Sequence, residues 1–131
     1  MYSIKIRVRY SETDQMGRAY YANYFVWFEI ARTEYFRKLG FSYREFEKKG
    51  LFLPVVHASC DYKNKVEYDD EININCTASA ESRMRLVFRY EITGEEGKFI
   101  ASGSTIHVFI DSGGRPVKIP EHIADLLKNE H

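Results

Sequence analysis

Eight aromatic side chains fall between positions 20 and 36, and this concentration constrains the fold of the chain more than any other feature. Steps of about 100° per residue predict a helix from Tyr24 to Leu39 within the same region. Asn23 is expected as its N-cap and Gly40 as its C-terminal stop. So large an aromatic surface is sheltered from water only in a core, an interface or a ligand tunnel. The helix is therefore predicted to be buried and wrapped by other elements.

One side of this helix is predicted to face the core, and it carries Tyr24, Phe28, Ala31, Tyr35 and Leu39. Val26 and Ile30 make the N-terminal half apolar on its opposite side, so that half is expected to be buried on both sides. A single sheet layer covers only one face of a helix, and a second chain is one source of the missing cover. Arg32 projects into the apolar arc, where a charge needs a partner, and Glu29 is its nearest candidate.

Alternation of apolar and polar residues predicts five strands around this helix. They cover roughly residues 4–11, 54–62, 72–80, 84–92 and 99–110. A short helix is expected from Ser42 to Lys49, with Ser42 as its N-cap, and another is expected from Pro120. The order of strand, long helix, short helix and four successive strands predicts an α+β fold, with an antiparallel meander wrapped on one helix.

The 131 residues fit a single domain, residues 1–131, with enough surface to bury a core. Lysine plus arginine and aspartate plus glutamate number 19 each, so no global positive field favours nucleic acid or an anionic membrane. No stretch approaches the ~20 apolar residues of a membrane span. The first ten residues have the alternation of a strand rather than the apolar run of a signal peptide, and a cytoplasmic location is expected.

Metal-binding patterns are missing from the sequence. Cys60 and Cys76 have no paired spacing and are expected to be small core residues, with no disulfide in a reducing compartment. The four histidines are scattered at His57, His107, His122 and His131, so no helical pair of zinc ligands forms. Neither a metal nor another cofactor is predicted.

The segment from Glu12 to Gly17 is predicted to be a tight turn between the first strand and the long helix. It has little apolar content, and Gly17 adopts backbone angles that other residues avoid. Asp14 lies in the middle of this turn.

The run from Tyr10 to Arg32 resembles the hotdog-fold acyl-CoA thioesterases of the 4-hydroxybenzoyl-CoA thioesterase and Tol-Pal-associated type. The matching residues are Thr13-Asp14, Gly17, Tyr20, Asn23-Tyr24, Phe28-Glu29 and Ala31-Arg32. A second stretch, with Asp61-Tyr62 and then Tyr68 to Ile72, is similar to the junction between the second and third strands of that family. The resemblance implies a hotdog fold, in which a five-stranded antiparallel sheet wraps around one long central helix.

The same resemblance implies a thioester hydrolase with Asp14 as nucleophile or general base. The backbone amide of Tyr21, seven residues later, would polarise the thioester carbonyl. Tyrosine at this position departs from the Tol-Pal-associated branch, which usually has histidine, and Asn64-Lys65 stands where Pro-Ala is common. The implied site is shared across a homodimer or homotetramer.

Substrate contacts are expected from two groups of residues. The first lies in the matched motif and comprises Gly17, Tyr20, Asn23 and Tyr24. The second is basic and is expected to meet the phosphates of coenzyme A; it comprises Lys63, Lys65, Arg83 and Arg85, with Arg89 nearby.

The sequence leaves two other functions open. One is a thioesterase acting on acyl carrier protein, and the other is a non-catalytic acyl-CoA-binding module. A hotdog dehydratase is disfavoured, because that activity needs a histidine facing a carboxylate and no histidine precedes His57.

Overall fold

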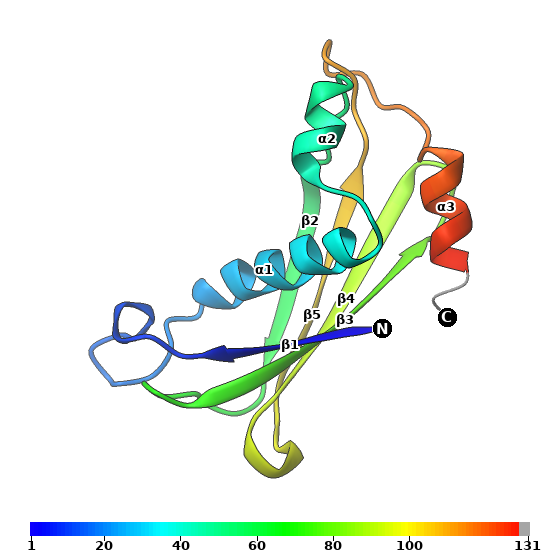
Figure 1. Ribbon diagram of the computed structural model, residues 1–131. Coiled ribbons are helices and arrows are strands. Elements are labelled where there is room, and N and C mark those ends of the chain that lie inside the picture. Colours follow the sequence, from blue (N-terminus) through cyan, green and yellow to red (C-terminus); the bar gives the residue numbers. More distant parts are fainter. Residues whose placement is uncertain (129–131) are drawn as a thin grey trace.

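The computed structural model describes residues 1–128; residues 129–131, and with them His131, lie outside the described part. A five-stranded antiparallel sheet with the strand order β1-β3-β4-β5-β2 forms its centre (Figure 1). The strands are β1 Tyr2–Arg7, β2 Val55–Tyr62, β3 Glu71–Ala80, β4 Arg85–Thr93 and β5 Phe99–Val108. The helices are α1 Asn23–Lys38, α2 Tyr43–Lys48 and α3 Glu121–Lys128, with short 3-10 turns η1 Tyr10–Glu12 and η2 Glu95–Gly97. The predicted α+β hotdog fold is confirmed.

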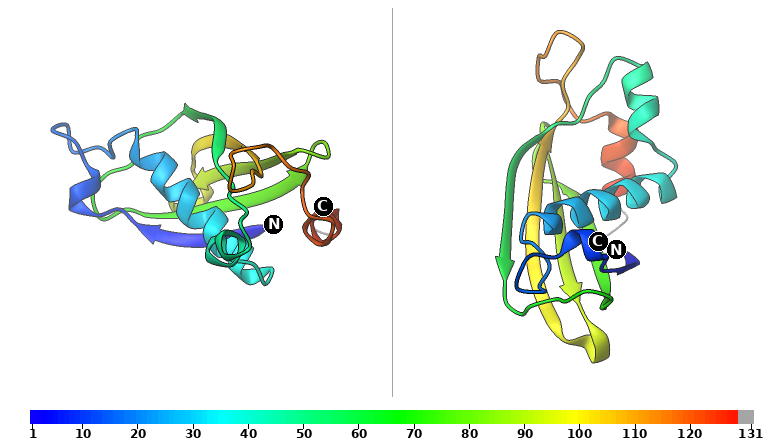
Figure 2. Two further views of the ribbon diagram at one scale, coloured as in Figure 1. Left: turned by 90° about the horizontal axis from the view of Figure 1, so that it is seen from above. Right: turned by 90° about the vertical axis from the view of Figure 1, so that its left-hand side faces the viewer.

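Helix α1 crosses one face of the curved sheet and makes a second layer (Figure 2). Alternate residues of β3 and β4 are buried on this face, as a period of two requires. At the centre, the ring of Phe28 on α1 stacks on Tyr90 of β4 with 4.2 Å between ring centroids. Gly103 of β5 makes room for this stack, because a Cβ there would lie 2.6 Å from the Phe28 ring. The aromatic side chains of α1 thus form the core, as predicted.

The ends of two elements differ from the sequence prediction. Strand β1 stops at Arg7 rather than Ser11, since residues 10–12 turn into η1 and the Arg9 amide donates to the Glu12 carboxylate at 2.8 Å. Asn23 is the first residue of α1 rather than its N-cap, and its side-chain amide donates to the Glu12 carbonyl at 2.9 Å. The predicted cap of α2 is confirmed, because the Ser42 hydroxyl accepts from the Glu45 amide at 3.2 Å.

Within residues 1–128, strand β2 pairs only with β5, which makes it an edge strand. A bulge between Val55 and His57 shifts its register, so Val55 rather than Val56 shares a face with Ala58. Most of β2 is exposed, and Val26 and Ile30 on the neighbouring side of α1 are 45% and 42% exposed. The second apolar side of α1 is therefore open in the single chain.

The two cysteines are unbridged, with Cys76 buried in the core and Cys60 partly buried. Burial raises the pKa of Cys76 to about 12, so its thiol stays protonated. Within residues 1–128, no three histidine, cysteine, aspartate or glutamate side chains converge as metal ligands would. In the same residues, no helix combines the length and the apolar character that crossing a membrane requires.

Candidate active site

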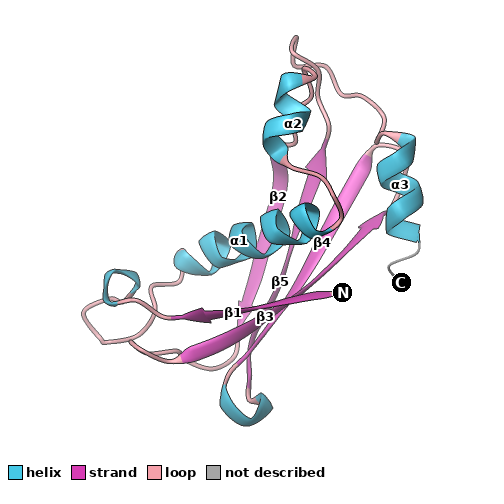
Figure 3. Cartoon of the chain, in the orientation of Figure 1, coloured by secondary structure: helices cyan, strands magenta, loops and turns pink. Residues whose placement is uncertain are grey.

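The Asp14 turn follows η1 in the loop at the end of β1 (Figure 3). It is closed by a bridge between Thr13 and Ala19, and the Gly17 amide donates to the Asp14 carbonyl at 3.0 Å. Gly17 has a φ of 77°, a conformation that favours glycine. Gly17, which was predicted to contact the substrate, thus serves to form the backbone of the turn.

The two carboxylate oxygens of Asp14 have different surroundings. Oδ1 accepts hydrogen bonds from the main-chain amides of Met16 at 2.8 Å and Arg18 at 3.3 Å. Oδ2 has no hydrogen-bond partner among residues 1–128, and the residue is exposed. One oxygen therefore anchors the carboxylate while the other remains open to a reactant.

The Tyr21 amide points out of the N-terminal end of α1. The preceding carbonyl, that of Tyr20, accepts from the Asn23 amide at 2.9 Å and so points into the helix. In a trans peptide the N–H group points away from the C=O group, so the Tyr21 N–H points outward. It has no acceptor in the described part of the chain. An unsatisfied amide at a helix start also carries the positive end of the helix dipole.

Tyr62, at the end of β2, holds this helix start from the sheet side. Its hydroxyl donates to the Tyr21 carbonyl at 2.9 Å, and its ring packs against that of Tyr24 with 4.7 Å between centroids. Burial is the main cause that raises the pKa of Tyr62, so the hydroxyl remains a donor at neutral pH. Tyr24 itself is buried, whereas Tyr20 is exposed with its ring 4.7 Å from that of Tyr21.

A pocket of about 290 Å³ opens beside the Tyr21 residue, between the start of α1 and the end of β2. Its lining residues are Arg18, Ala19, Tyr21, Tyr24, Tyr62, Lys63, Asn64, Lys65 and Val66. Three of them are basic, and Lys65 forms an exposed ion pair with Glu67 at 3.7 Å. The structure thus brings the predicted Lys63 and Lys65 together with the predicted Tyr21 and Tyr24.

Arg83 and Arg85 lie at the opposite end of the sheet. Tyr62, next to Lys63, pairs with Ala101 of β5, whereas Arg85 pairs with Val108. These two positions on β5 lie about 23 Å apart along the strand. Arg89 is engaged elsewhere, since it donates to Ser79 at 3.1 Å and pairs with Glu81. The expected joint cluster of cations is not formed within one chain.

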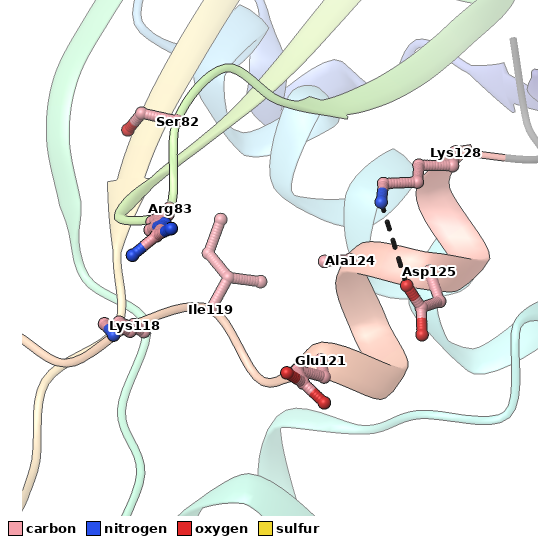
Figure 4. Close-up of a pocket in the computed structure, with 8 residues that line it drawn as sticks. All are labelled: Ser82, Arg83, Lys118, Ile119, Glu121, Ala124, Asp125 and Lys128. Carbon is pink, nitrogen blue, oxygen red and sulfur yellow. Dashed lines mark ion pairs between the residues drawn. The ribbon is translucent and has the colours of Figure 1, made fainter.

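A second, larger pocket of about 490 Å³ lies at this opposite end, under α3 (Figure 4). Its lining residues are Ser82, Arg83, Lys118, Ile119, Glu121, Ala124, Asp125 and Lys128. Lys128 and Asp125 form an exposed ion pair at 3.9 Å, and Ile119 lies between Arg83 and the helix. Basic and acidic side chains therefore share this pocket, which lies far from Asp14.

Glu12 is a residue of the site region that the sequence analysis missed. It is 4% exposed, and its carboxylate accepts from the Arg9 amide at 2.8 Å and the Trp27 indole at 2.9 Å. Burial opposes its ionisation, but hydrogen bonds from Arg9 and Trp27 outweigh this and hold the pKa of Glu12 below its ordinary value. The one signal in the sequence is Trp27, because the N–H group of a buried tryptophan needs an acceptor.

Arg32 does not form the ion pair expected with Glu29, which has no ionic partner in residues 1–128. It extends instead toward the hydroxyls of Tyr90 and Tyr43. Burial opposes its charge, but these hydroxyls outweigh that effect and raise the pKa of Arg32. Its Nε has no hydrogen-bond partner in residues 1–128, and it lies beside a polar network inside the core, in which the Thr105 hydroxyl bonds to Tyr90 at 2.6 Å and to His107 at 2.8 Å.

Comparison with known proteins adds a family match over most of the chain. Residues 8–127 match the family described as the thioesterase-like superfamily. YneP of Bacillus subtilis is 34% identical over 122 residues, which cover 92% of this chain and 88% of YneP. The acyl-CoA thioesterase YbgC of Haemophilus influenzae is 30% identical over 125 residues, covering 93% of this chain and 90% of that protein.

Solved structures agree with this match. A DHNA-CoA thioesterase from Staphylococcus aureus superposes with a TM-score of 0.87 at 36% identity, covering 96% of this chain and 85% of that one. A protein of Aquifex aeolicus superposes with a TM-score of 0.90 at 31% identity, over 97% of this chain and 99% of that one.

Proposed function

From the premise that this chain belongs to the thioesterase-like superfamily, we propose that it hydrolyses an acyl-CoA thioester to a free acid and coenzyme A. Related chains named as acyl-CoA thioesterase and DHNA-CoA thioesterase support this reaction. One observation carries the assignment to a site: a carboxylate with an open oxygen precedes, by seven residues, an unsatisfied amide at a helix start. These are the two groups that hydrolysis of a thioester needs.

The amide of Tyr21 polarises the thioester carbonyl. Attack on the carbonyl carbon moves negative charge onto its oxygen, and a fixed N–H donor stabilises that charge more in the transition state than in the substrate. The α1 dipole adds to this effect. Only the main chain of Tyr21 takes part, so a tyrosine side chain is compatible with this role.

Asp14 supplies the second group, by one of two routes. As a nucleophile, Oδ2 bonds to the carbonyl carbon, the coenzyme A thiolate leaves, and water then hydrolyses the mixed anhydride. As a general base, Oδ2 takes a proton from the water that attacks the same carbon. The bonds from Met16 and Arg18 to Oδ1 favour both routes, because they hold the carboxylate in one orientation.

The coenzyme A portion binds at the pocket beside Tyr21. Lys63, Lys65 and Arg18 line it, and their positive charges suit phosphate groups. An acyl carrier protein thioester is the enzymatic alternative, since its phosphopantetheine arm carries the same thioester. Comparing one acyl chain on coenzyme A and on carrier protein separates the two, and we expect the higher kcat/KM for the coenzyme A thioester.

A second copy of the chain covers the open face of α1 and β2. The face combines the exposed Val26 and Ile30 with an edge strand whose main-chain groups are unpaired on one side. Antiparallel pairing of two β2 strands would extend the sheet and bury the α1 helices of both chains, as in a homodimer. Two such dimers can still pair into a homotetramer. Light scattering tests this: Ile30→Lys is expected to yield monomers. A cytoplasmic location stays a prediction.

The reaction itself is tested with purified protein and a panel of aromatic and aliphatic acyl-CoAs. We expect turnover of at least one member and its loss in Asp14→Asn. Coenzyme A binding without turnover of any member would instead favour a non-catalytic acyl-CoA-binding module. A single turnover in ¹⁸O-labelled water tests the nucleophile route, because ¹⁸O in Asp14 requires that water attacked the aspartyl carbon of a mixed anhydride.

A further inference from the structure

Glu12 and Asp14 are two carboxylates two residues apart with opposite environments. Asp14 is exposed and keeps one oxygen open, whereas Glu12 is 4% exposed and both of its oxygens accept hydrogen bonds. A buried carboxylate is costly unless its hydrogen bonds and charge are satisfied. The hydrogen bonds and the charge of Glu12 are satisfied by Arg9, just before η1, and by Trp27 of α1.

The side chain of Glu12 joins the turn to the second turn of α1. Its Oε1 accepts from the Arg9 amide at 2.8 Å, and its Oε2 accepts from the Trp27 indole at 2.9 Å. The Arg9 guanidinium lies 3.4 Å from Oε2 and contributes the opposite charge. All three partners are donors, so the position requires a group that only accepts, and an ionised carboxylate is such a group.

The main chain of Glu12 joins the same turn to the start of α1. Its carbonyl accepts from the Tyr20 amide at 2.8 Å and from the Asn23 side chain at 2.9 Å. Tyr20 comes directly before Tyr21, whose amide is the proposed donor, and Asn23 lies two residues after it. Glu12 is therefore bonded on both sides of one reacting group and lies two residues from the other.

We propose that Glu12 is a positioning residue that fixes the Asp14 carboxylate relative to the Tyr21 amide through its bonds to Arg9, Trp27, Tyr20 and Asn23. The proposal rests on the proposed thioesterase function. It assigns the buried carboxylate a role in kcat, since misplacement of a reacting group by about 1 Å costs on the order of 100-fold in rate.

The test begins with Glu12→Gln, which keeps the shape of the side chain but turns one oxygen into an NH₂ group. That group must face either the Arg9 amide or the Trp27 indole, both donors, and the contact pushes the turn away from α1. We expect kcat to fall by about 10–100-fold while the KM for the acyl-CoA changes by less than about threefold.

Trp27→Phe separates positioning from a general loss of stability. Alone, it removes one donor to Oε2 and is expected to lower kcat by about threefold to tenfold. In the double variant Glu12→Gln, Trp27→Phe the new NH₂ group faces no indole donor, and the exposed Arg9 guanidinium can turn away into solvent, so kcat should recover to above that of Glu12→Gln alone. Ile123→Val, a buried change in α3, is the control for lost stability and should keep the wild-type kcat.

Hydrogen exchange provides a readout that needs no turnover. In Glu12→Gln, the Tyr20 and Arg18 amides are expected to exchange at least about tenfold faster, while that of Phe88 in β4 is unchanged. A wild-type chain that hydrolyses no thioester would overturn the proposed function. Hydrogen exchange would then still test whether Glu12 holds the turn against α1. Glu12→Gln with wild-type kcat, or with unchanged exchange at Tyr20 and Arg18, would overturn the positioning role.

Discussion

The two ends of the sheet each have a pocket lined by basic side chains, but they differ in the polar groups that are left open. At the Asp14 end, the pocket of about 290 Å³ is lined by Tyr21, whose amide has no partner in the described residues, and by Arg18, whose amide bonds to the Asp14 carboxylate. At the α3 end, the pocket of about 490 Å³ is larger, and its acidic and basic groups lie together, as in the Asp125–Lys128 pair. We therefore propose the reaction at the smaller pocket, on the basis of these open, fixed polar groups rather than of cavity volume.

The ends also differ in where they hold buried polar groups. Near Asp14, the buried carboxylate of Glu12 ties the turn to α1. Toward the α3 end, His107 lies in the core and contacts Thr105 at 2.8 Å. Changes at the first end are therefore expected to act on turnover, and changes at the second on stability.

The largest effect is expected from removing the charge of Asp14. Asp14→Asn keeps the Oδ1 acceptor for Met16 and Arg18 but removes the nucleophile or base, so kcat should fall by at least about 1,000-fold. Steady-state kinetics check this. The matched change at the other end, Asp125→Asn, should leave kcat within about twofold of wild type; equal losses in both variants would break the comparison.

The next effect concerns stability near the α3 end. Burial, and then the charge of Arg32, lower the pKa of His107 to about 4, so folding favours its neutral form. The unfolded chain binds the proton more strongly, and stability is therefore full above pH 6.5 and is lost as the pH falls toward 4. Urea unfolding should give a loss of about 2 kcal/mol from this residue between pH 7 and pH 5.

His107→Gln is the control for that measurement, because it cannot gain the proton. Its unfolding free energy should lack this part of the pH dependence, and its kcat at pH 7 should equal that of wild type. A variant with the same slope as wild type would show that another group titrates.

A smaller effect is expected on binding of coenzyme A thioesters. The double change Lys63→Ala, Lys65→Ala removes two positive charges beside Tyr21 and should raise KM by about tenfold, with a weaker salt dependence. The change Arg83→Ala, Lys118→Ala removes two charges at the α3 pocket and should leave KM unchanged. If it were the second pair that raised KM, the phosphates would bind at the α3 end, or at a site that a partner chain completes.

The smallest effect is expected from Tyr62→Phe. The change removes the hydroxyl that donates to the Tyr21 carbonyl but keeps the ring that packs on Tyr24. We expect kcat to fall by about threefold to fivefold, since the helix start loses one of its supports. Tyr68→Phe is a matched exposed control, and the idea fails if both variants behave alike.

The fold was largely predictable from the sequence, because α1 and the strands have strong periodicities. The helix predicted from Tyr24 to Leu39 runs from Asn23 to Lys38. The predicted meander is wrong for β2, which pairs with β5 at the sheet edge instead of with β3, so the strand order is β1-β3-β4-β5-β2. The end of β1 was missed because Val8 and Tyr10 continue the alternation into η1. Alternation reports which side chains are apolar, not where the main chain leaves the sheet.

The site was predictable only in part. Asp14 and Tyr21 came from a matched motif, and the structure finds an open oxygen and an open amide at these positions. Glu12 was missed because a glutamate in a polar turn resembles a solvated charge, and its burial depends on a tryptophan fifteen residues later. Asn23 and Arg32 were given wrong partners, since their contacts lie on elements distant in sequence.

We propose above all that the Asp14 end of the sheet binds the thioester. The most direct test is titration of ¹⁵N-labelled protein with a non-hydrolysable thioether analogue of an acyl-CoA, followed by amide NMR. We expect the amide signals of Tyr21, Lys63 and Lys65 to shift in a saturable way while those of Arg83 and Ala124 stay in place. Shifts at Arg83 and Ala124 with none at Tyr21 would contradict it.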